Sequence, residues 1–317
     1  MKSSKSFLSL NLNLNLNLSL ILSLILSLNL LLISRAPAQL KVVTTLTDLK
    51  SITEFIGGDR VEVFAIARGY QNPHFVDPKP SYILKLSKAD VFVTVGLDLE
   101  IGWVPPLLNS ARNAKIQKGG EGYVDASVNI PLLQVPSSIN RGEGDIHIYG
   151  NPHYWLDPAN GAIIAQNIFN CLVRLDPDHR DVYQANLKKF NETLASKMKE
   201  WASKTAGVKN MRVIAYHNEW PYFEQRFGIV IADFLEPKPG IPPTPSQLAK
   251  VIAEMKRENI KILINSPYFT ADAATLVAKN SGGKVVTLAT SVGAYENIKS
   301  YFDLFDYDVA QMVAAIQ

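Results

Sequence analysis

The stretch Pro177–Thr205 reads PDHRDVYQANLKKFNETLASKMKEWASKT and is the longest helical pattern in this 317-residue chain. Its apolar residues recur mostly three or four positions apart, and no Gly or Pro follows Pro177 until Gly207. A helix of about 27 residues would be roughly 40 Å long at about 1.5 Å per residue, which is the length of a whole domain. The stretch therefore predicts a spine that joins two lobes, with a long packed helix inside one domain as the plainer alternative.

Short runs rich in Val and Ile alternate with helical patterns on both sides of this stretch, as in parallel α/β sheets. The predicted fold class is α/β, with two lobes that are each a mainly parallel sheet flanked by helices, joined by one long rigid helix. We expect the N-terminal lobe at 39–176, the linking helix at 177–205 and the C-terminal lobe at 206–317. Strands are expected at 41–45, 61–65, 90–95, 212–215, 229–234, 260–264 and 285–288.

Two helix starts carry capping signals. Asp157 is a favourable N-cap because Pro158 follows it at the first helical position. The run Thr-Pro-Ser-Gln from Thr244 to Gln247 predicts a capping box after a proline-rich loop.

Residues 1–38 have the pattern of a signal peptide. Lys2 and Lys5 form a positive start, a Leu-rich stretch runs over 7–33, and Ala36-Pro37-Ala38 offers a cleavage signal. The apolar stretch exceeds the usual length of about 7–15 residues. An uncleaved membrane anchor is therefore an alternative to removal. Both readings predict an exported, periplasmic or extracytoplasmic protein.

Charge and cysteine content exclude several classes of protein. The chain has 32 Lys and Arg against 29 Asp and Glu, and three of the basic residues lie in 1–38, so the remainder is balanced. Balanced charge gives no reason to expect nucleic acid or an anionic membrane as a partner. Cys171 is the only cysteine, which excludes a disulfide framework and a cysteine-based zinc site. It lies far from the N-terminus, so we expect no lipid-attachment cysteine.

Three of the five histidines occur in ordered local contexts. Asn-Pro-His occurs twice and ends at His74 and His153, where proline stiffens the preceding backbone. His217 follows an apolar strand, and ligands of open α/β sheets bind beyond the carboxyl ends of strands. Three imidazoles from distant parts of a chain suit a borderline metal such as zinc. His147 is expected to be an exposed loop residue with a lesser claim to the metal, and His179 to be structural.

Most enzyme motifs are missing from the sequence. It contains no His-Glu-x-x-His helix, no phosphate-binding Gly-x-x-x-x-Gly-Lys loop and no Gly-x-Ser-x-Gly elbow. His217-Asn218-Glu219 matches the start of a zinc-deaminase signature, but that signature needs two cysteines.

Four motifs resemble those of one protein family. They are Asn72-Pro-His-x-x-Asp-Pro, His153-Tyr-Trp-Leu-Asp-Pro, Tyr-His-x-x-Trp-x-Tyr-Phe at 216–223 and Glu236-Pro-Lys-Pro-Gly-Ile-Pro-Pro-Thr-Pro. Together they resemble the metal-specific (zinc/manganese) substrate-binding proteins of ABC importers, the periplasmic solute-binding family of the zinc-uptake type. The resemblance implies a monomer that holds a divalent metal ion between two lobes, passes it to a membrane permease and catalyses no reaction.

Carried over to this chain, the resemblance implies the metal ligands His74 and His153 in the first lobe and His217 in the second. Manganese-selective members have a carboxylate at the His217 position, so imidazole here favours Zn²⁺ as the transported ligand and makes Mn²⁺ the weaker candidate. The family commonly adds an aspartate at the position that Thr290 occupies. The fourth ligand therefore stays open, between water and an acid from elsewhere.

Two functions fit three histidines. One is capture of zinc for an importer, and the other is an exported zinc-dependent hydrolase that uses three histidines and a water molecule. We favour capture, because no general base stands at a defined spacing from the histidines.

Overall fold

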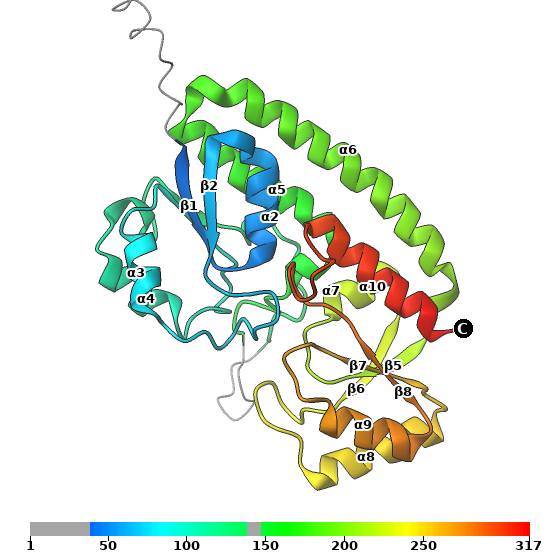
Figure 1. Cartoon of the computed structure of the whole chain (residues 1–317). Coiled ribbons are helices and arrows are strands. Elements are labelled where there is room, and N and C mark those ends of the chain that lie inside the picture. The colour runs from blue at the N-terminus through cyan, green and yellow to red at the C-terminus, as the bar shows by residue number, and fades with distance from the viewer. Residues whose placement is uncertain (1–38, 138–146) are drawn as a thin grey trace, which may run out of the picture. The chain divides into compact units, whose positions relative to one another are not determined.

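A long helix, α6 (Arg180–Lys204), crosses the molecule from one sheet to the other (Figure 1). The computed structural model describes residues 39–137 and 147–317. The predicted signal peptide at 1–38 lies outside the described residues. The helix begins three residues later than expected, after a 3-10 turn at Pro177–His179. Asp176 holds this turn, since its carboxylate accepts hydrogen bonds from Nδ1 of His179 at 2.8 Å and from the hydroxyl of Tyr183 at 2.6 Å.

The N-terminal sheet is parallel and has the strand order β2-β1-β3-β4. Its strands are β1 (Leu40–Thr44), β2 (Val61–Ala65), β3 (Val91–Thr94) and β4 (Tyr123–Asp125). The helices of this part are α2 (Thr47–Gly57), α3 (Pro80–Leu86), α4 (Val104–Ala111) and α5 (Pro158–Leu175). The sequence did not predict β4, because three residues are too few to show a strand period.

The C-terminal sheet is also parallel, with the order β6-β5-β7-β8. Its strands are β5 (Arg212–Ala215), β6 (Val230–Phe234), β7 (Ile262–Asn265) and β8 (Lys284–Thr287). Its helices are α7 (Pro221–Phe227), α8 (Pro245–Arg257), α9 (Ala271–Ser281) and α10 (Tyr301–Ala315). The predicted fold class, two parallel α/β lobes joined by a long helix, is confirmed.

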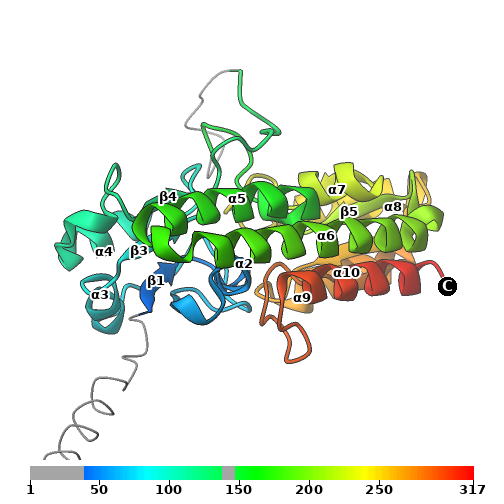
Figure 2. The same cartoon turned by 90° about the horizontal axis from the view of Figure 1, so that it is seen from above.

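Aromatic side chains tie α6 to both lobes. Phe190 of α6 lies 5.3 Å from the ring of Phe55 in α2 and 5.1 Å from that of Phe302 in α10. Further along, Trp201 packs on Phe305 of α10, with ring centroids 5.3 Å apart. Figure 2 shows α5 and α10 lying along α6, in agreement with their contacts. Because α6 is buried against both lobes, it acts as a brace rather than as a free connector.

The main hydrophobic core is continuous across the two lobes. It contains residues of the first sheet such as Phe92 and residues of the second such as Val213, and all of Leu40–Gln317 forms one compact unit. A smaller core lies under α8 and α9. No helix among the described residues is long and apolar enough to cross a membrane.

The two predicted helix starts differ in outcome. Asp157 caps α5 as expected, since its side chain accepts a hydrogen bond from the backbone N–H of Ala159 at 2.9 Å. At α8, Thr244 accepts from the backbone N–H of Gln247, but the reciprocal half of the capping box does not form. The side chain of Gln247 instead donates to the carbonyl of Phe234 at 2.8 Å, because that strand-end acceptor lies within reach.

Candidate metal centre

Adjacent strands of the C-terminal sheet deliver two site residues to the same edge. Ala215 at the end of β5 pairs with Phe234 at the end of β6, and His217 and Glu236 each follow two residues later. Parallel strands end at a common edge of the sheet, where ligands of α/β proteins bind. The Nδ1 atom of His217 lies 2.6 Å from Oε2 of Glu236, and both side chains are buried. The helix expected directly after His217 begins only at Pro221.

The two Asn-Pro-His copies fold in the same way. The side-chain oxygen of Asn72 accepts a hydrogen bond from the backbone N–H of His74 at 3.0 Å, and Asn151 does the same for His153 at 3.1 Å. These are Asx turns, in which a side chain replaces a backbone acceptor two residues back. The repeated tripeptide is therefore a device that presents an imidazole from a stiff turn.

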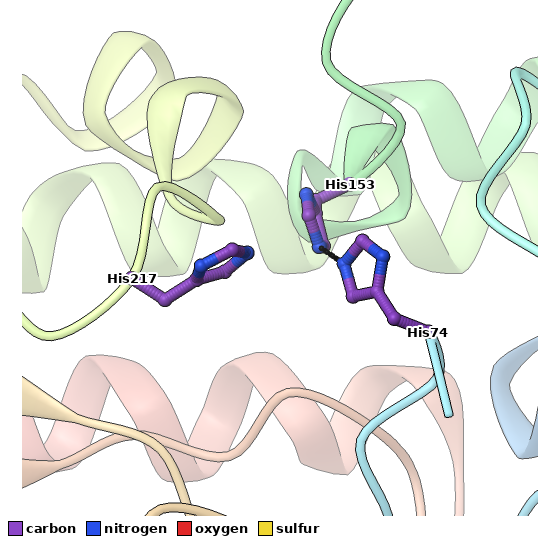
Figure 3. Close-up of side chains that lie close together, drawn as sticks. All are labelled: His74, His153 and His217. Carbon is purple, nitrogen blue, oxygen red and sulfur yellow. Dashed lines mark hydrogen bonds between the residues drawn. The ribbon is translucent and has the colours of Figure 1, made fainter. Parts of the chain in front are cut away.

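The structure brings His74, His153 and His217 together from three separate segments (Figure 3). Their possible ligand atoms all lie within 4.8 Å of one another, and Nε2 of His74 is 3.1 Å from Nε2 of His153. The ring centroids of the three pairs are 5.1, 5.6 and 5.5 Å apart. Tetrahedral zinc with Zn–N bonds of about 2.0–2.1 Å would separate imidazole centroids by about 5.2 Å. The observed triangle is close to the size that zinc requires.

Hydrogen bonds leave a ring nitrogen available for a metal. Nδ1 of His153 faces the side-chain oxygen of Asn151 at 3.0 Å, and Nδ1 of His217 faces Glu236. An oxygen acceptor at Nδ1 holds the proton there, so the lone pair lies on Nε2. This arrangement, a metal-binding nitrogen on one side and an oxygen partner on the other, is typical of zinc-binding histidines.

Burial favours the neutral form of two of the imidazoles, which is the form that binds a metal. Burial, followed by the neighbouring imidazoles, lowers the pKa of both His74 and His153 well below 6.5. Two carboxylates lie on the second-lobe side: Glu236, and Glu219, which receives hydrogen bonds from the hydroxyls of Ser266 and Tyr268. Burial raises the pKa of Glu219. The pocket therefore combines candidate imidazole ligands with the carboxyl groups of Glu236 and Glu219, which lie behind them.

A small cavity of about 220 Å³ opens beside these residues and is lined by His74, Phe75, His217, Glu236 and Phe269, among others. A larger hollow of about 560 Å³ lies in the first lobe near Glu100 and Asp125. It contains none of the three clustered histidines. The compact histidine cavity is the better metal site, because an ion needs convergent ligands rather than volume.

The two remaining histidines differ in position. His179 lies outside the cluster and is held by Asp176 at the start of the spine, as expected for a structural residue. His147 was expected to be an exposed loop residue, and this was wrong. Its side chain is partly buried, and its ring lies 5.1 Å from that of His74 and 6.3 Å from that of His153. Glycine-rich sequence gave no sign of this tertiary contact.

Sequence reasoning also missed Glu236. The residue opens the proline-rich loop directly after β6, at the same edge as His217. Its position could have been suspected from the sequence, because Glu236 follows the end of one strand by two residues, as His217 does. Thr290, at the position where the resemblance places an acid, is buried. Its hydroxyl oxygen has no partner among the described residues, and its carbonyl accepts a 2.8 Å hydrogen bond from Nε1 of Trp155.

Comparisons with known proteins point to one family. A family model described as "Zinc-uptake complex component A periplasmic" matches residues 42–315. The manganese ABC transporter substrate-binding lipoprotein PsaA of Streptococcus pneumoniae is 26% identical over 288 residues, covering 88% of this chain and 89% of that protein. The iron ABC transporter substrate-binding lipoprotein MtsA of Streptococcus pyogenes serotype M1 is 29% identical over 223 residues, 69% of each chain.

Solved structures share the fold. A crystal structure of ZnuA superposes with a TM-score of 0.74 at 23% identity and covers 88% of this chain and 100% of that chain. The Mn-bound periplasmic metal binding protein from Candidatus Liberibacter asiaticus gives a TM-score of 0.71 at 20% identity, with 87% and 99% covered. The two curated relatives are named lipoproteins, whereas the only cysteine of this chain, Cys171, is buried in α5.

Proposed function

The chain belongs to the family of zinc-uptake complex component A periplasmic proteins, and we propose that it captures zinc between its lobes and delivers it to an ABC importer. Its curated relatives are substrate-binding proteins of metal ABC transporters, so a divalent metal and a permease are the natural partners. We propose that the protein is exported by residues 1–38, acts as a monomer and catalyses no reaction.

The observation that carries the proposal is the convergence of His74, His153 and His217. Within the described residues this is the one group of three ligating side chains, and all three are imidazoles. Imidazole suits zinc, whereas manganese prefers carboxylate and carbonyl oxygens. Relatives are named for manganese and iron, so the family binds more than one metal. The three imidazoles of this chain support zinc.

The zinc hydrolase finds no support in the site. A metal-bound water needs a general base within hydrogen-bond reach. Two carboxylates described on this side of the site are engaged: Glu236 accepts from His217, and Glu219 accepts from Ser266 and Tyr268.

Titration of the metal-free protein with zinc in competition with a chelator tests the proposal. His74→Ala, His153→Ala and His217→Ala should each weaken zinc binding at least about tenfold, because each removes one of three ligands. His179→Ala is the matched control, since it removes a histidine outside the cluster and should leave affinity unchanged. Unchanged zinc affinity in any two of the three ligand variants would exclude this site.

A further inference from the structure

His147 lies beside the histidine cluster and has a ring nitrogen without a hydrogen-bond partner among the described residues. Its Nε2 atom is buried and has no hydrogen-bond partner among the described residues. Buried polar atoms in proteins are normally paired, so an unpaired one beside a predicted metal site needs an explanation. The ring of His147 lies close to those of His74 and His153, so the residue borders the histidine cluster.

The other side of the His147 ring is anchored. The ring hydrogen-bonds the backbone of Leu97, in the turn that follows β3. Gly96, Leu97 and Asp98 all have positive φ, a conformation that persists in non-glycine residues only where surrounding contacts enforce it. Glu100 provides such contacts, because its carboxylate accepts hydrogen bonds from the N–H groups of Val95 and Gly96 at 2.7 and 3.0 Å. The anchor of His147 is thus a fixed point of the first lobe.

His147 therefore repeats the pattern of the two hydrogen-bonded ligands. His153 is held by Asn151 and His217 by Glu236, and in each case one ring nitrogen is tied to an oxygen while the other is left for the centre. His147 is tied to Leu97 and leaves Nε2 unpaired. We propose that Nε2 of His147 is the fourth zinc ligand, after a small movement of its ring toward the cluster.

The distances of the His147 ring from those of His74 and His153 can be compared with the spacing that this role requires. Four imidazoles around tetrahedral zinc would have centroids about 5.2 Å apart. The ring of His147 already meets this spacing with His74, at 5.1 Å, and stands about 1 Å too far from His153, at 6.3 Å. Side-chain adjustments of this size are common when a ligand binds.

A fourth imidazole changes what the site can do. Zinc with four protein ligands has a complete coordination sphere, whereas catalytic zinc keeps one coordination position for water. A shell of four nitrogens without a hard oxygen ligand also raises the preference for zinc over manganese. The inference rests on the proposed metal-binding function and gives that function its selectivity and its lack of hydrolytic chemistry.

Cobalt can report the fourth ligand, because Co²⁺ takes the place of Zn²⁺ and its visible absorption depends on its ligands. We would compare wild type, His147→Gln and the loop control Tyr149→Ala, each loaded with one Co²⁺, between pH 6 and pH 9. A water on catalytic zinc ionises near pH 7, and we expect comparable behaviour on cobalt. Wild type and Tyr149→Ala should therefore keep one spectrum, and His147→Gln should titrate. Zinc-edge X-ray absorption should count four imidazoles in wild type and three in His147→Gln, whose zinc affinity should fall at least about tenfold.

The outcomes separate this inference from the proposed function. A wild-type cobalt spectrum that titrates, or a count of three imidazoles in wild type, overturns the role of His147 while leaving the three-histidine site intact. Wild type that binds neither zinc nor cobalt overturns the proposed function itself. Both wild-type measurements are decisive even where His147→Gln folds poorly.

Discussion

Oε2 of Glu236 lies 2.6 Å from Nδ1 of His217, although 18 residues separate them in the chain. The pairing follows from the sheet, in which β5 and β6 end side by side. An acceptor at Nδ1 of His217 holds the proton there and leaves Nε2 for a metal, and the carboxylate would lie behind the ligand of a bound cation. Gly240 also donates its backbone N–H to the same carboxylate oxygen at 3.3 Å, so the proline-rich loop is tied to the site.

Glu236→Gln should therefore weaken zinc binding without removing a ligand. The amide keeps the shape of the side chain but loses its charge, and such outer-shell changes cost about 10–100-fold in affinity. Chelator competition measures the loss, and Glu192→Gln on the exposed surface of α6 is the matched control. A Glu236→Gln variant with wild-type zinc affinity would show that this carboxylate does not support the ligand.

Thr290→Asp should change metal preference. The hydroxyl of Thr290 is buried without a described partner, beside Trp155, whose ring lies 5.4 Å from that of His153. A carboxylate there would add a hard oxygen ligand, so manganese affinity should rise relative to zinc affinity. The effect should be larger in the His147→Gln background, where the fourth position is vacated. Paired zinc and manganese titrations test this, and equal ratios in all variants would mean that residue 290 does not face the metal.

Zinc affinity should persist to a lower pH than the ordinary pKa of histidine would allow. The pKa of His74 and of His153 lies well below 6.5, and that of His147 is lowered to about 4, chiefly by burial. Protons therefore compete with the metal only well below the normal histidine range. We expect nearly constant affinity from pH 8 to about pH 6 and a steep loss toward pH 4. A loss centred on pH 6.5 in a titration series would contradict the buried, neutral ligands.

The same shifts affect the stability of the metal-free protein. As pH falls below 6.5, His153 takes up a proton in the unfolded chain but stays neutral in the folded protein, where its pKa is lower. The free energy of unfolding should therefore fall. Asp48 acts in the opposite direction, because burial raises its pKa to about 6 and the folded state binds its proton first. The difference between wild type and His153→Gln in urea unfolding at pH 7.5 and pH 5.5 isolates the histidine. Its destabilising effect on wild type should be greater at pH 5.5.

Metal binding should move the two lobes only slightly. α6 is braced on both, and Arg226 of α7 makes paired hydrogen bonds to Asp157 at the start of α5, at 2.6 and 2.8 Å. Hinge closure needs residues that absorb large changes in φ and ψ, and a continuous helix provides none. The radius of gyration of metal-free and zinc-loaded protein should differ by less than about 1 Å. A difference of several ångströms in the radius of gyration from small-angle scattering would contradict the prediction that α6 holds the two lobes in place.

Much of the architecture was readable from local pattern. Helix α6, seven of the eight strands and the cap at Asp157 follow from apolar periodicity and capping chemistry, which act over a few residues. The three-residue strand β4 was not readable, because it owes its form to pairing with β3 rather than to its own pattern. The second half of the capping box at Thr244 failed because Gln247 found a tertiary acceptor in Phe234.

The two α/β lobes, the spine and the three candidate histidines could be predicted from the sequence, since each is encoded by periodicity, by Asn-Pro-His turns or by the end of an apolar strand. The pairing of Glu236 with His217 and the place of His147 beside the cluster follow from the tertiary structure instead. Glu236 depends on which strands are neighbours, and His147 depends on a turn of the first lobe that holds its ring. Such relationships join residues with no shared local pattern, so the packed chain alone establishes them.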